Sequence, residues 1–332
     1  MLDYTSSASF RAAPYKIRMD ILILGGNGFS GSHLVDAFLL EGHQVRVLDK
    51  IDEKFRSPLP GVDYRIGDFT DESFLAESLV NIDCVFHALS TTVPATSNLN
   101  PKADAQINLI GTIGLLDQMV KAGVQNIIYF SSGGTVYGNR EEGHIPEAQL
   151  LHPIGSSYAI SKVAAENYLL LYEKLHGIRP LILRISNLYG PRYGRVGDQG
   201  IITTFLNAII NNESLKVWGD GSAVRDYLYI DDLIRFCILA VKSRETGVFN
   251  VGAGEGHSIL EVVDIISKVV GRSVDVKFEK SRELEIKRVI LDISKANQVF
   301  HWLPHVSLEE GIDCVWSWTK SIPFMKSKAL QI

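Results

Sequence analysis

Cysteine is scarce in this sequence, with three residues among 332. Cys84, Cys237 and Cys314 are odd in number, far apart and set among apolar neighbours. A set of this kind favours neither a disulfide framework nor a metal site. We therefore expect all three to be reduced residues of the core, and we expect no bound metal.

Long apolar runs and an excess of basic charge are also missing. No uninterrupted apolar stretch approaches the ~18 residues of a membrane helix, and the polar N-terminus lacks the apolar segment of a secretory signal. The sequence therefore predicts no membrane attachment and a cytoplasmic location. A formal net charge of -5 argues against a general nucleic-acid binder. An anionic substrate would need local basic residues.

The chain can form a large core, since 46% of its residues are hydrophobic. Its length suggests one large domain or two intimately joined domains. Residues 1–18 show no periodicity. We predict that they are a disordered leader or an added extension outside the fold.

The stretch from Asp20 to Gly31 begins with an apolar run that is too short for a helix, which predicts a buried parallel strand. It continues into glycines spaced as Gly25-x-x-Gly28-x-x-Gly31. Gly25 permits a tight turn, Gly28 lets the backbone approach a pyrophosphate, and Gly31 lets the next helix, about 29–41, pack against the strand. Taken alone, the pattern is equally compatible with a plain tight turn.

A second strand supports the nucleotide-binding interpretation. Residues 44–48 end on Asp49, close to the ~20-residue offset of an acid that binds the ribose of a dinucleotide. A carboxylate there accepts from both ribose hydroxyls and repels a 2'-phosphate, which favours NAD over NADP. The alternative is a solvated carboxylate at a strand end.

Strands and helices alternate further along the chain. Residues 63–66, 83–87 and 126–130 are typical of strands and residues 101–122 of a helix. We predict an α/β fold, with a doubly wound parallel sheet of the Rossmann type and a smaller C-terminal α/β substrate domain.

Three positions near these strands have competing interpretations. Asp68 either accepts from an adenine amino group or caps a helix, and Phe69 next to it can flank the ring. His87, inside the 83–87 strand, is interpreted as a packed core histidine rather than a catalyst. Small polar residues follow that strand at the edge where open α/β sheets bind ligands.

The segment that carries chemistry begins a helix predicted to run from Ser157 to about Leu175. Tyr158 and Lys162 are four apart and share one helix face. A phenol ordinarily has a pKa near ~10. A neighbouring lysine and a positively charged nicotinamide would both favour the phenolate, so we expect Tyr158 to act as a base. An isolated Tyr-x-x-x-Lys is more typical of a surface pair, but the glycine turn and the Ser-ending strand before it favour catalysis.

Together these motifs resemble the extended short-chain dehydrogenase/reductase family. The glycine turn, the Ser131-to-Gly138 segment and Tyr158-x-x-x-Lys162 carry the resemblance. From Met19 to about Trp318 the chain is most similar to nucleotide-sugar epimerases of the UDP-glucose 4-epimerase type. The resemblance implies an NAD-binding Rossmann domain over 19–184 and a mainly nucleotide-sugar-binding domain over 185–332, with 227–252 returning to the Rossmann domain.

The C-terminal half carries arginines suited to a diphosphate. An arginine's planar fork matches phosphate oxygens, although either arginine alone is typical of a surface ion pair. The epimerase family places an Asn, two arginines and an acid around UDP, which match Asn187, Arg225, Arg282 and Glu285. The family's acid is usually Asp, so Glu285 is a departure at the ribose contact.

A second departure concerns the sugar hydroxyl. In the epimerases that this chain resembles, a serine that binds the hydroxyl stands where this chain has Gly133. We expect Ser132 to take that role, with Thr135 as the alternative, because Gly133 gives the backbone room to shift. Family members that dehydrate or decarboxylate the sugar generally carry an acid just before Val-Tyr-Gly. This chain has Gly134-Thr135 there, which favours an epimerase.

The sequence thus predicts NAD-dependent 4-epimerisation of a UDP-hexose or UDP-N-acetylhexosamine through a transient 4-keto sugar. The alternatives are another NAD-dependent nucleotide-sugar modifier of the same family (an epimerase at another carbon, a dehydratase or a decarboxylase) and a non-catalytic NAD-sensing protein. The resemblance also implies a homodimer through the helices that begin near Pro101 and Ser157. Val289 either leaves room for an N-acetyl group or only packs the core.

The expected site residues fall into three sets. The catalytic set is Ser132, Thr135, Tyr158 and Lys162. NAD is expected to contact Gly25, Asn27, Gly28, Phe29, Gly31, Asp49, Lys50, Asp68, Phe69, Ala88, Leu89, Ser90, Asn108, Ser131, Tyr158, Lys162 and Ile185. The UDP-sugar is expected to contact Thr91, Ser132, Gly133, Tyr158, Asn187, Arg225, Arg282, Glu285 and Val289.

Overall fold

A computed structural model describes residues 18–90, 92, 94–139, 142–153, 155–193, 200–281 and 286–321. Three of the expected substrate-binding residues, Thr91, Arg282 and Glu285, lie outside this range. Within it, the structure contains no helix with the length and apolar character needed to span a membrane.

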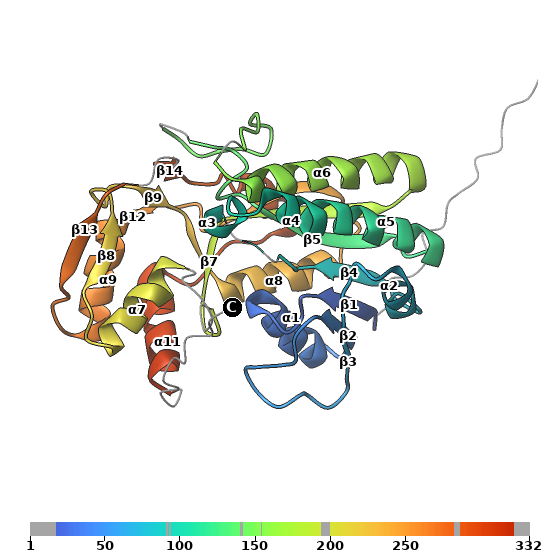
Figure 1. Cartoon of the computed structure of the whole chain (residues 1–332), viewed down its shortest axis with the longest axis horizontal. Helices are drawn as coiled ribbons and strands as arrows, with labels where there is room; N and C mark the ends of the chain where they lie inside the picture. The colour runs from blue at the N-terminus through green and yellow to red at the C-terminus, as the bar shows by residue number, and fades with distance from the viewer. Residues whose placement is uncertain are drawn as a thin grey trace, which may run out of the picture.

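A seven-stranded sheet lies at the centre of the molecule, in the order β11-β6-β5-β4-β1-β2-β3 (Figure 1). Every neighbouring pair in it is parallel. Its strands are β1 (Asp20–Leu24), β2 (Gln44–Asp49), β3 (Val62–Ile66), β4 (Cys84–His87), β5 (Asn126–Ser132), β6 (Arg179–Ile185) and β11 (Gly247–Val251). The predicted parallel Rossmann sheet is confirmed.

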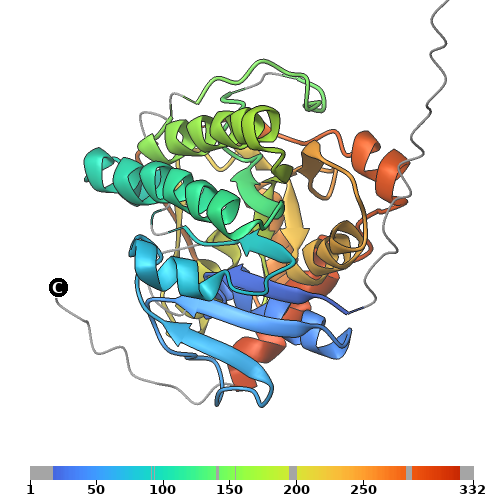
Figure 2. The ribbon, with the colours of Figure 1, turned by 90° about the vertical axis from the view of Figure 1, so that its right-hand side faces the viewer.

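Helices cover both faces of this sheet. On one face lie α2 (Glu72–Ser78), α4 (Pro101–Ala105), α5 (Gly111–Ala122) and α6 (Ser157–His176), and on the other lie α1 (Phe29–Leu40) and α8 (Ile230–Val241). The alternation of β1 explains the two layers. Ile21 and Ile23 belong to the core cluster that includes α1, whereas Leu22 and Leu24 belong to the cluster under α5 and α6. Figure 2 shows α5 and α6 side by side along their face.

Small sheets and helices form the other end of the molecule (Figure 1, left). The strands there are β7 (Asn187–Tyr189) with β10 (Tyr227–Tyr229), β8 (Leu215–Trp218) with β13 (Val276–Glu279), and β9 (Val224–Arg225) between β12 (His257–Ser258) and β14 (Arg288–Val289). The helices there are α7 (Ile201–Ile210), α9 (Ile259–Val270) and α11 (Leu308–Ser321). The helix α10 (Ser294–Phe300) instead packs against β11 and α8, and the short α3 (Pro94–Ser97) follows β4. The division into domains at residue 184 stays a prediction.

Local signals explain where the main helices begin and end. The side chain of Ser156 caps α6 by accepting from the backbone N–H of Ala159, and α6 ends at Gly177, which has φ +70°. The predicted helix over 101–122 is continuous but contains a π-helical turn, η1 (Gln106–Ile110), between α4 and α5. Such turns often occur at functional sites.

The cysteine expectation needs one correction. Cys84 and Cys237 are buried free thiols, but Cys314 is exposed. The buried face of α11 is formed by Leu308, Gly311, Ile312 and Val315, and position 314 lies off that face. An apolar neighbour in sequence is therefore a poor guide to burial on an amphipathic helix.

Candidate active site

The glycine turn joins β1 to the start of α1. The N–H of Gly28 donates to the carbonyl of Gly25 over 3.1 Å, and Gly25 has φ +81°. A Cβ at position 31 would lie 2.0 Å from that same carbonyl oxygen. No side chain caps the N-terminus of α1, so the amides of its first turn are available to an anion. This turn fits the pyrophosphate of a dinucleotide.

Asp49 lies at the end of β2 beside this turn. Its side chain is 8% exposed and accepts from the backbone N–H of Asn27 over 3.0 Å and of Ile51 over 3.3 Å. Burial raises the pKa of its carboxyl, against these hydrogen bonds. The buried Oδ1 of Asn27 has no partner among the described residues. Both side chains therefore offer acceptor capacity to ribose hydroxyls, which fits NAD.

The proposed adenine side differs from the expectation in two respects. Asp68 pairs with Lys50 over 2.8 Å and accepts from the backbone N–H of Thr70, whereas the cap of α2 is Asp71. The helix-cap interpretation of Asp68 is therefore wrong, and its contact with adenine stays a prediction. Phe69 is 1% exposed in the core cluster, so its ring cannot flank a base without leaving the core.

The end of β4 forms the wall opposite the glycine turn. Leu89 lies so close that a Cβ at Gly25 would be 3.0 Å from its Cα. Ala88 and Leu89 are half-buried, and the exposed Ser90 follows them. His87 is 2% exposed, its Nε2 is 3.0 Å from Thr112 Oγ1, and burial lowers its pKa to about 3. Its interpretation as a packed core histidine is confirmed.

The π-helical turn brings Asn108 to a buried polar cluster that sequence reasoning missed. Asn108 Nδ2 donates to Asp104 Oδ1 over 2.8 Å and to Thr92 Oγ1 over 3.0 Å. The fully buried carboxylate of Asp104 also accepts from Ser157 and Ser161 on α6 over 2.9 and 2.7 Å. Asp104 thereby fixes the start of α6 against η1. Asn108 Oδ1 is buried with no partner among the described residues.

Three hydroxyls connect the end of β5 to α6. Thr135 Oγ1 donates to Ser132 Oγ over 2.9 Å, and Ser132 hydrogen-bonds the phenol of the half-buried Tyr158. Burial raises the pKa of Tyr158 to about 12, while the bond from Ser132 opposes that rise. The structure thus places Ser132 between the two other candidates for hydroxyl chemistry.

Lys162 lies one helical turn beyond Tyr158. It is 2% exposed, its Nζ donates to the carbonyl of Phe130 over 2.7 Å, and the same atom is 5.7 Å from the centre of the Tyr158 ring. Burial lowers the pKa of Lys162 to about 8, partly offset by Glu166 and Asp104. The expectation that this lysine and a positively charged nicotinamide together favour the phenolate stays a prediction, and they would act against the rise that burial causes.

A buried ion pair behind the catalytic helix was also missed. Arg184 on β6 forms an ion pair with Glu166 on α6 over 2.6 Å. Its Nε and Nη2 atoms both donate hydrogen bonds to the carboxylate of Glu166. Ser131 donates to the same carboxylate, and Arg184 Nη1 donates to the Tyr137 hydroxyl over 3.0 Å. Ser131 therefore contacts this pair, and its expected contact with NAD stays a prediction.

The backbone next to Ser132 explains the missing family serine. A Cβ at Gly133 would lie 2.6 Å from Leu291 Cδ1 and 2.9 Å from the carbonyl oxygen of Arg184. The N–H of Gly133 donates to the carbonyl of Ile185 over 2.8 Å. A Cβ at Gly134 would lie 3.0 Å from Asn187 Oδ1, so Asn187 faces this turn. A serine at 133 would clash, which leaves Ser132 as the neighbouring hydroxyl.

Arg225 and Val289, two of the residues expected to contact the UDP-sugar, differ in exposure. Arg225 is half-buried on β9 and its Nη1 donates to the carbonyl of Val224 over 3.0 Å. Val289 is 1% exposed and belongs to a core cluster with Val136 and Tyr137. The burial of Val289 fits the alternative that it packs the core, and its role as a gate beside the sugar stays a prediction.

Asp226 holds the surrounding loops together. Its fully buried carboxylate accepts from the N–H groups of Ala253, Gly254 and Leu291 over 2.7, 3.2 and 3.1 Å. Burial raises its pKa, and these bonds oppose the rise. One carboxylate thus ties the end of β11 to the segment after β14.

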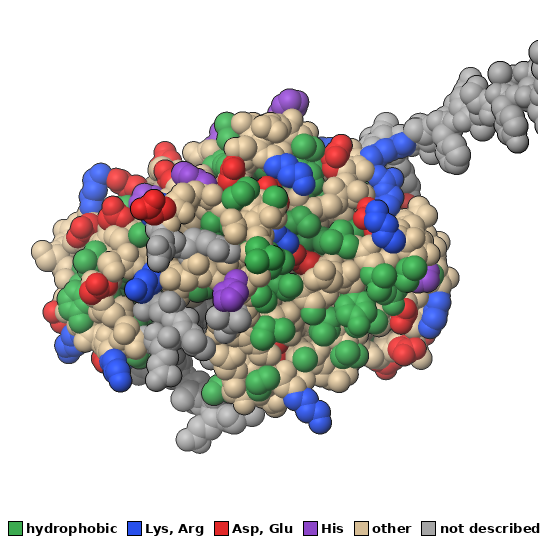
Figure 3. Space-filling model, turned by 90° about the horizontal axis from the view of Figure 1, so that it is seen from above, with side chains coloured by type: hydrophobic (Ala, Val, Ile, Leu, Met, Phe, Trp, Pro, Cys, Tyr) green, Lys and Arg blue, Asp and Glu red, His purple; other side chains and the backbone are tan. Residues whose placement is uncertain are grey.

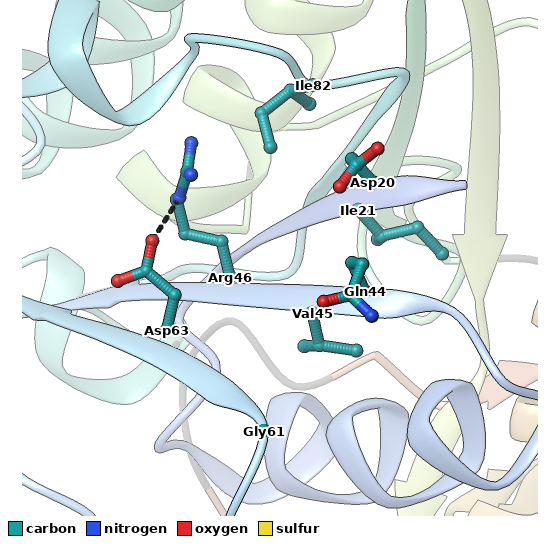
Figure 4. A pocket seen from close by; sticks show the side chains of 8 residues that line it. All are labelled: Asp20, Ile21, Gln44, Val45, Arg46, Gly61, Asp63 and Ile82. Atoms are coloured by element: carbon teal, nitrogen blue, oxygen red, sulfur yellow. Dashed lines mark hydrogen bonds and ion pairs between the residues drawn. The ribbon is translucent and has the colours of Figure 1, made fainter. Parts of the chain in front are cut away.

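Ser132, Thr135, Tyr158 and Lys162 line neither of two cavities in the described part of the chain. Figure 4 shows one of about 100 Å³, at the opposite, amino-terminal edge of the sheet, lined by Asp20, Ile21, Gln44, Val45, Arg46, Gly61, Asp63 and Ile82. The other, of about 380 Å³, is lined by His144, Ala253, Gly254, Leu291, Asp292, Ile293 and Ser294. The described residues contain no group of three or more His, Cys, Asp and Glu side chains arranged to hold a metal.

Comparisons with known proteins agree with this geometry. Residues 21–252 match the model of the NAD dependent epimerase/dehydratase family. The chain is 34% identical over 303 residues to a putative UDP-glucose 4-epimerase of Methanocaldococcus jannaschii (91% of this chain, 98% of the relative). It is 30% identical over 306 residues to UDP-glucuronic acid decarboxylase 1 of Xenopus tropicalis (90% and 71%).

Two solved structures extend the comparison. The UDP-glucose 4-epimerase of Thermotoga maritima with UDP-glucose has a TM-score of 0.86 at 33% identity, covering 91% of this chain and 99% of that one. The UDP-glucose 4-epimerase of Thermus thermophilus in complex with NAD has a TM-score of 0.86 at 31% identity, with the same coverage of 91% and 99%.

Proposed function

Because the chain belongs to the NAD dependent epimerase/dehydratase family, we propose that it inverts carbon 4 of a UDP-hexose or UDP-N-acetylhexosamine through a transient 4-keto sugar. The chain is an NAD-dependent nucleotide-sugar enzyme. The observation that carries the finer proposal is the series of hydroxyls from Thr135 through Ser132 to Tyr158. Bound NAD supplies a hydride acceptor that can return the hydride to the same carbon.

Tyr158 is the proposed base for the 4-hydroxyl proton. Its raised pKa means that the phenolate must be stabilised at the moment of transfer, and a hydrogen bond from Ser132 favours the charged form. Thr135 donates to Ser132, so the Ser132 proton is directed toward Tyr158. A hydroxyl oxygen has two acceptor lone pairs, so Ser132 keeps one that can accept the 4-hydroxyl proton while Ser132 passes its own proton to Tyr158.

Lys162 is proposed to position the reacting groups. An ammonium has three N–H donors, and the bond to Phe130 uses one. The other two N–H donors remain for the ribose of the nicotinamide and for the phenolate oxygen of Tyr158. Because burial lowers its pKa to about 8, Lys162 carries its charge at neutral pH and loses it as the pH rises above that value.

A relative that is a decarboxylase makes the reaction type the point to test. Thr135 precedes Val-Tyr-Gly, and a side chain at Gly134 would crowd Asn187 Oδ1, 3.0 Å from its Cβ, so neither position carries the acid that the dehydrating and decarboxylating members have. We propose incubating the pure protein with UDP-glucose, UDP-galactose, their N-acetylated counterparts and UDP-glucuronic acid, and identifying the products by mass and NMR. Epimers of unchanged mass support the proposal, whereas loss of water or carbon dioxide contradicts it.

Ser132→Ala is expected to lower kcat by on the order of 10-fold or more. The substitution removes a hydrogen bond to a developing charge, which contributes roughly 1.5–3 kcal/mol. Thr135→Ala removes a bond one step further from Tyr158 and should cost less. Steady-state kinetics of the two variants decides the order. A larger loss in Thr135→Ala would move the role of the family serine to Thr135.

We also propose that the protein is a homodimer formed through α5 and α6. Figure 3 looks onto this face and shows hydrophobic side chains spread over it. The large exposed apolar residues of the two helices are Ile110, which immediately precedes α5, Val120, Ile160, Tyr168, Leu171 and Leu175. Contiguous apolar surface of this kind is typical of an interface between protein chains. A cytoplasmic location stays a prediction.

Leu171→Glu should convert the dimer into a monomer. A charge buried at an apolar interface is costly unless it is paired. Leu303→Glu is the matched control, because Leu303 is 47% exposed, against 45% for Leu171, and lies outside the two helices. Analytical ultracentrifugation gives the readout. A wild type that sediments as a monomer, or a Leu171→Glu variant that stays dimeric, contradicts the interface.

A further inference from the structure

Residues 190–193, which follow β7, contact α1 through three of its side chains. Tyr193 stacks on Phe29, the carbonyl of Pro191 is 3.0 Å from His33 Nε2, and Arg192 pairs with Asp36 over 2.8 Å. We propose that residues 190–193 form a clasp that retains the bound dinucleotide between turnovers, with Tyr193 as its securing residue. We call this segment the clasp.

The position of Tyr193 is fixed from two sides. Its ring centre is 4.5 Å from that of Phe29 with 28° between the planes. On the other side, a Cβ at Gly200 would lie 2.2 Å from Tyr193 Cε1, so only glycine allows the start of α7 to approach the ring this closely. The ring is therefore held between the first residue of α1 and the residue before α7.

The polar contacts of the clasp hold its backbone in a sharp turn. Arg192 has φ +71°, a left-handed conformation that is unfavourable for a residue other than glycine. Burial lowers the pKa of His33 to about 4, so the ring is neutral at pH 7 and has one N–H to donate to Pro191. Asp36 also pairs with Arg56, which joins the segment after β2 to the same carboxylate.

The helix face that the clasp covers begins at the cofactor turn. Phe29, His33 and Asp36 are spaced by four and three residues and therefore share one face of α1. Phe29 directly follows Gly28, whose turn presents the free amides of α1. A side chain stacked on Phe29 thus lies beside the proposed pyrophosphate position.

The need for retention follows from the reaction, and to this extent the inference rests on the proposed function. If hydride taken from carbon 4 must return to the same sugar, a reduced cofactor that dissociates in mid-cycle leaves a 4-keto sugar behind. Each lost cofactor then inactivates one enzyme molecule until NAD rebinds. A contact that slows dissociation without touching the reacting atoms serves this cycle.

The test measures release of NAD from the holoenzyme, without any sugar. Wild type, Tyr193→Ala, Tyr193→Phe and Asp36→Asn are loaded with radiolabelled NAD and chased with excess unlabelled NAD. We expect ~10-fold faster release from Tyr193→Ala, the loss typical of an aromatic stack. Tyr193→Phe keeps the ring and should release NAD within about 2-fold of the wild-type rate. Asp36→Asn, which frees Arg192, should also accelerate release.

Each outcome bears on a separate claim. Equal rates of NAD release in wild type and Tyr193→Ala overturn the clasp. If Tyr193→Phe accelerates NAD release as much as Tyr193→Ala does, the role of the ring is overturned. If Tyr193→Ala fails to fold, as judged by its melting temperature, an unchanged rate in Asp36→Asn overturns the clasp by itself. A protein that releases NAD as expected but converts no UDP-sugar keeps the clasp and loses the proposed reaction.

Discussion

Tyr158→Phe is expected to bind NAD as tightly as the wild type while kcat falls by on the order of 10²-fold or more, the usual contribution of a positioned base. The ring that packs beside Lys162 is kept, so the change removes one hydroxyl and its bond to Ser132. Ser132 would then lose the phenol oxygen that accepts its proton. NAD titration and steady-state kinetics on the same preparation separate the two effects.

The matched control for this variant is Tyr168→Phe, which removes an exposed hydroxyl from the same helix. It should leave kcat within about 2-fold of the wild-type value, because it keeps the apolar ring on the proposed dimer face and removes no contact of the reacting groups. If Tyr158→Phe keeps wild-type kcat, Tyr158 is not the base. If it loses NAD as well as turnover, the residue is needed for cofactor binding and the kinetic result does not support acid–base chemistry.

Gly31→Ala is expected to abolish tight NAD binding. The added Cβ would lie 2.0 Å from the carbonyl oxygen of Gly25 and 2.7 Å from Gly26 Cα. These are backbone atoms of the turn itself, so the clash can be relieved only by opening the turn that presents the amides of α1. Overpacking usually costs ~1–3 kcal/mol, and rigid backbone neighbours place this change at the upper end. Calorimetry with NAD and thermal melts provide the readouts.

Gly114→Ala is the control, since Gly114 is also a helical glycine and nothing lies within 4 Å of its added Cβ. There the change should stabilise the protein by up to ~1 kcal/mol through helix propensity, with unchanged NAD affinity. A Gly31→Ala protein that binds NAD normally would show that the close approach of α1 to the turn is not needed for the cofactor.

The parts of the site that the sequence predicts well are local. The spacing of Tyr158 and Lys162 fixes their shared helix face, and the glycine turn has its own backbone signature in Gly25 and Gly31. Both depend only on neighbours within one turn of helix or one strand-to-helix connection. Their geometry therefore follows from the local sequence alone, without knowledge of the tertiary fold.

The parts that the sequence misses depend on tertiary placement. Glu166 and Arg184 lie on α6 and β6, and nothing in either segment indicates that they meet. Asp226 looks like an ordinary acid beside Arg225, yet its carboxylate joins the loop after β11 to the segment after β14. Such contacts depend on strand order and register, to which residue type and spacing give no access.

Two expected contacts meet the same difficulty. Phe69 and Val289 are apolar residues next to expected ligand-contacting positions, and both are buried in the core of this structure. An apolar side chain at the end of a strand looks the same in sequence whether it lines a pocket or fills a core. For Gly133 the reverse holds, because the structure supplies a reason for the glycine in the closeness of Leu291 and of the Arg184 carbonyl.

The most direct test of the account uses a UDP-sugar that carries deuterium at carbon 4. If a hydride passes to bound NAD and returns to the other face of the same carbon, the epimeric product keeps its deuterium in ordinary water. Mass spectrometry and NMR of the product from UDP-galactose labelled at that position measure this. We predict UDP-glucose with deuterium retained at carbon 4, and a product that has exchanged the label with water, or that has lost water, would contradict the account.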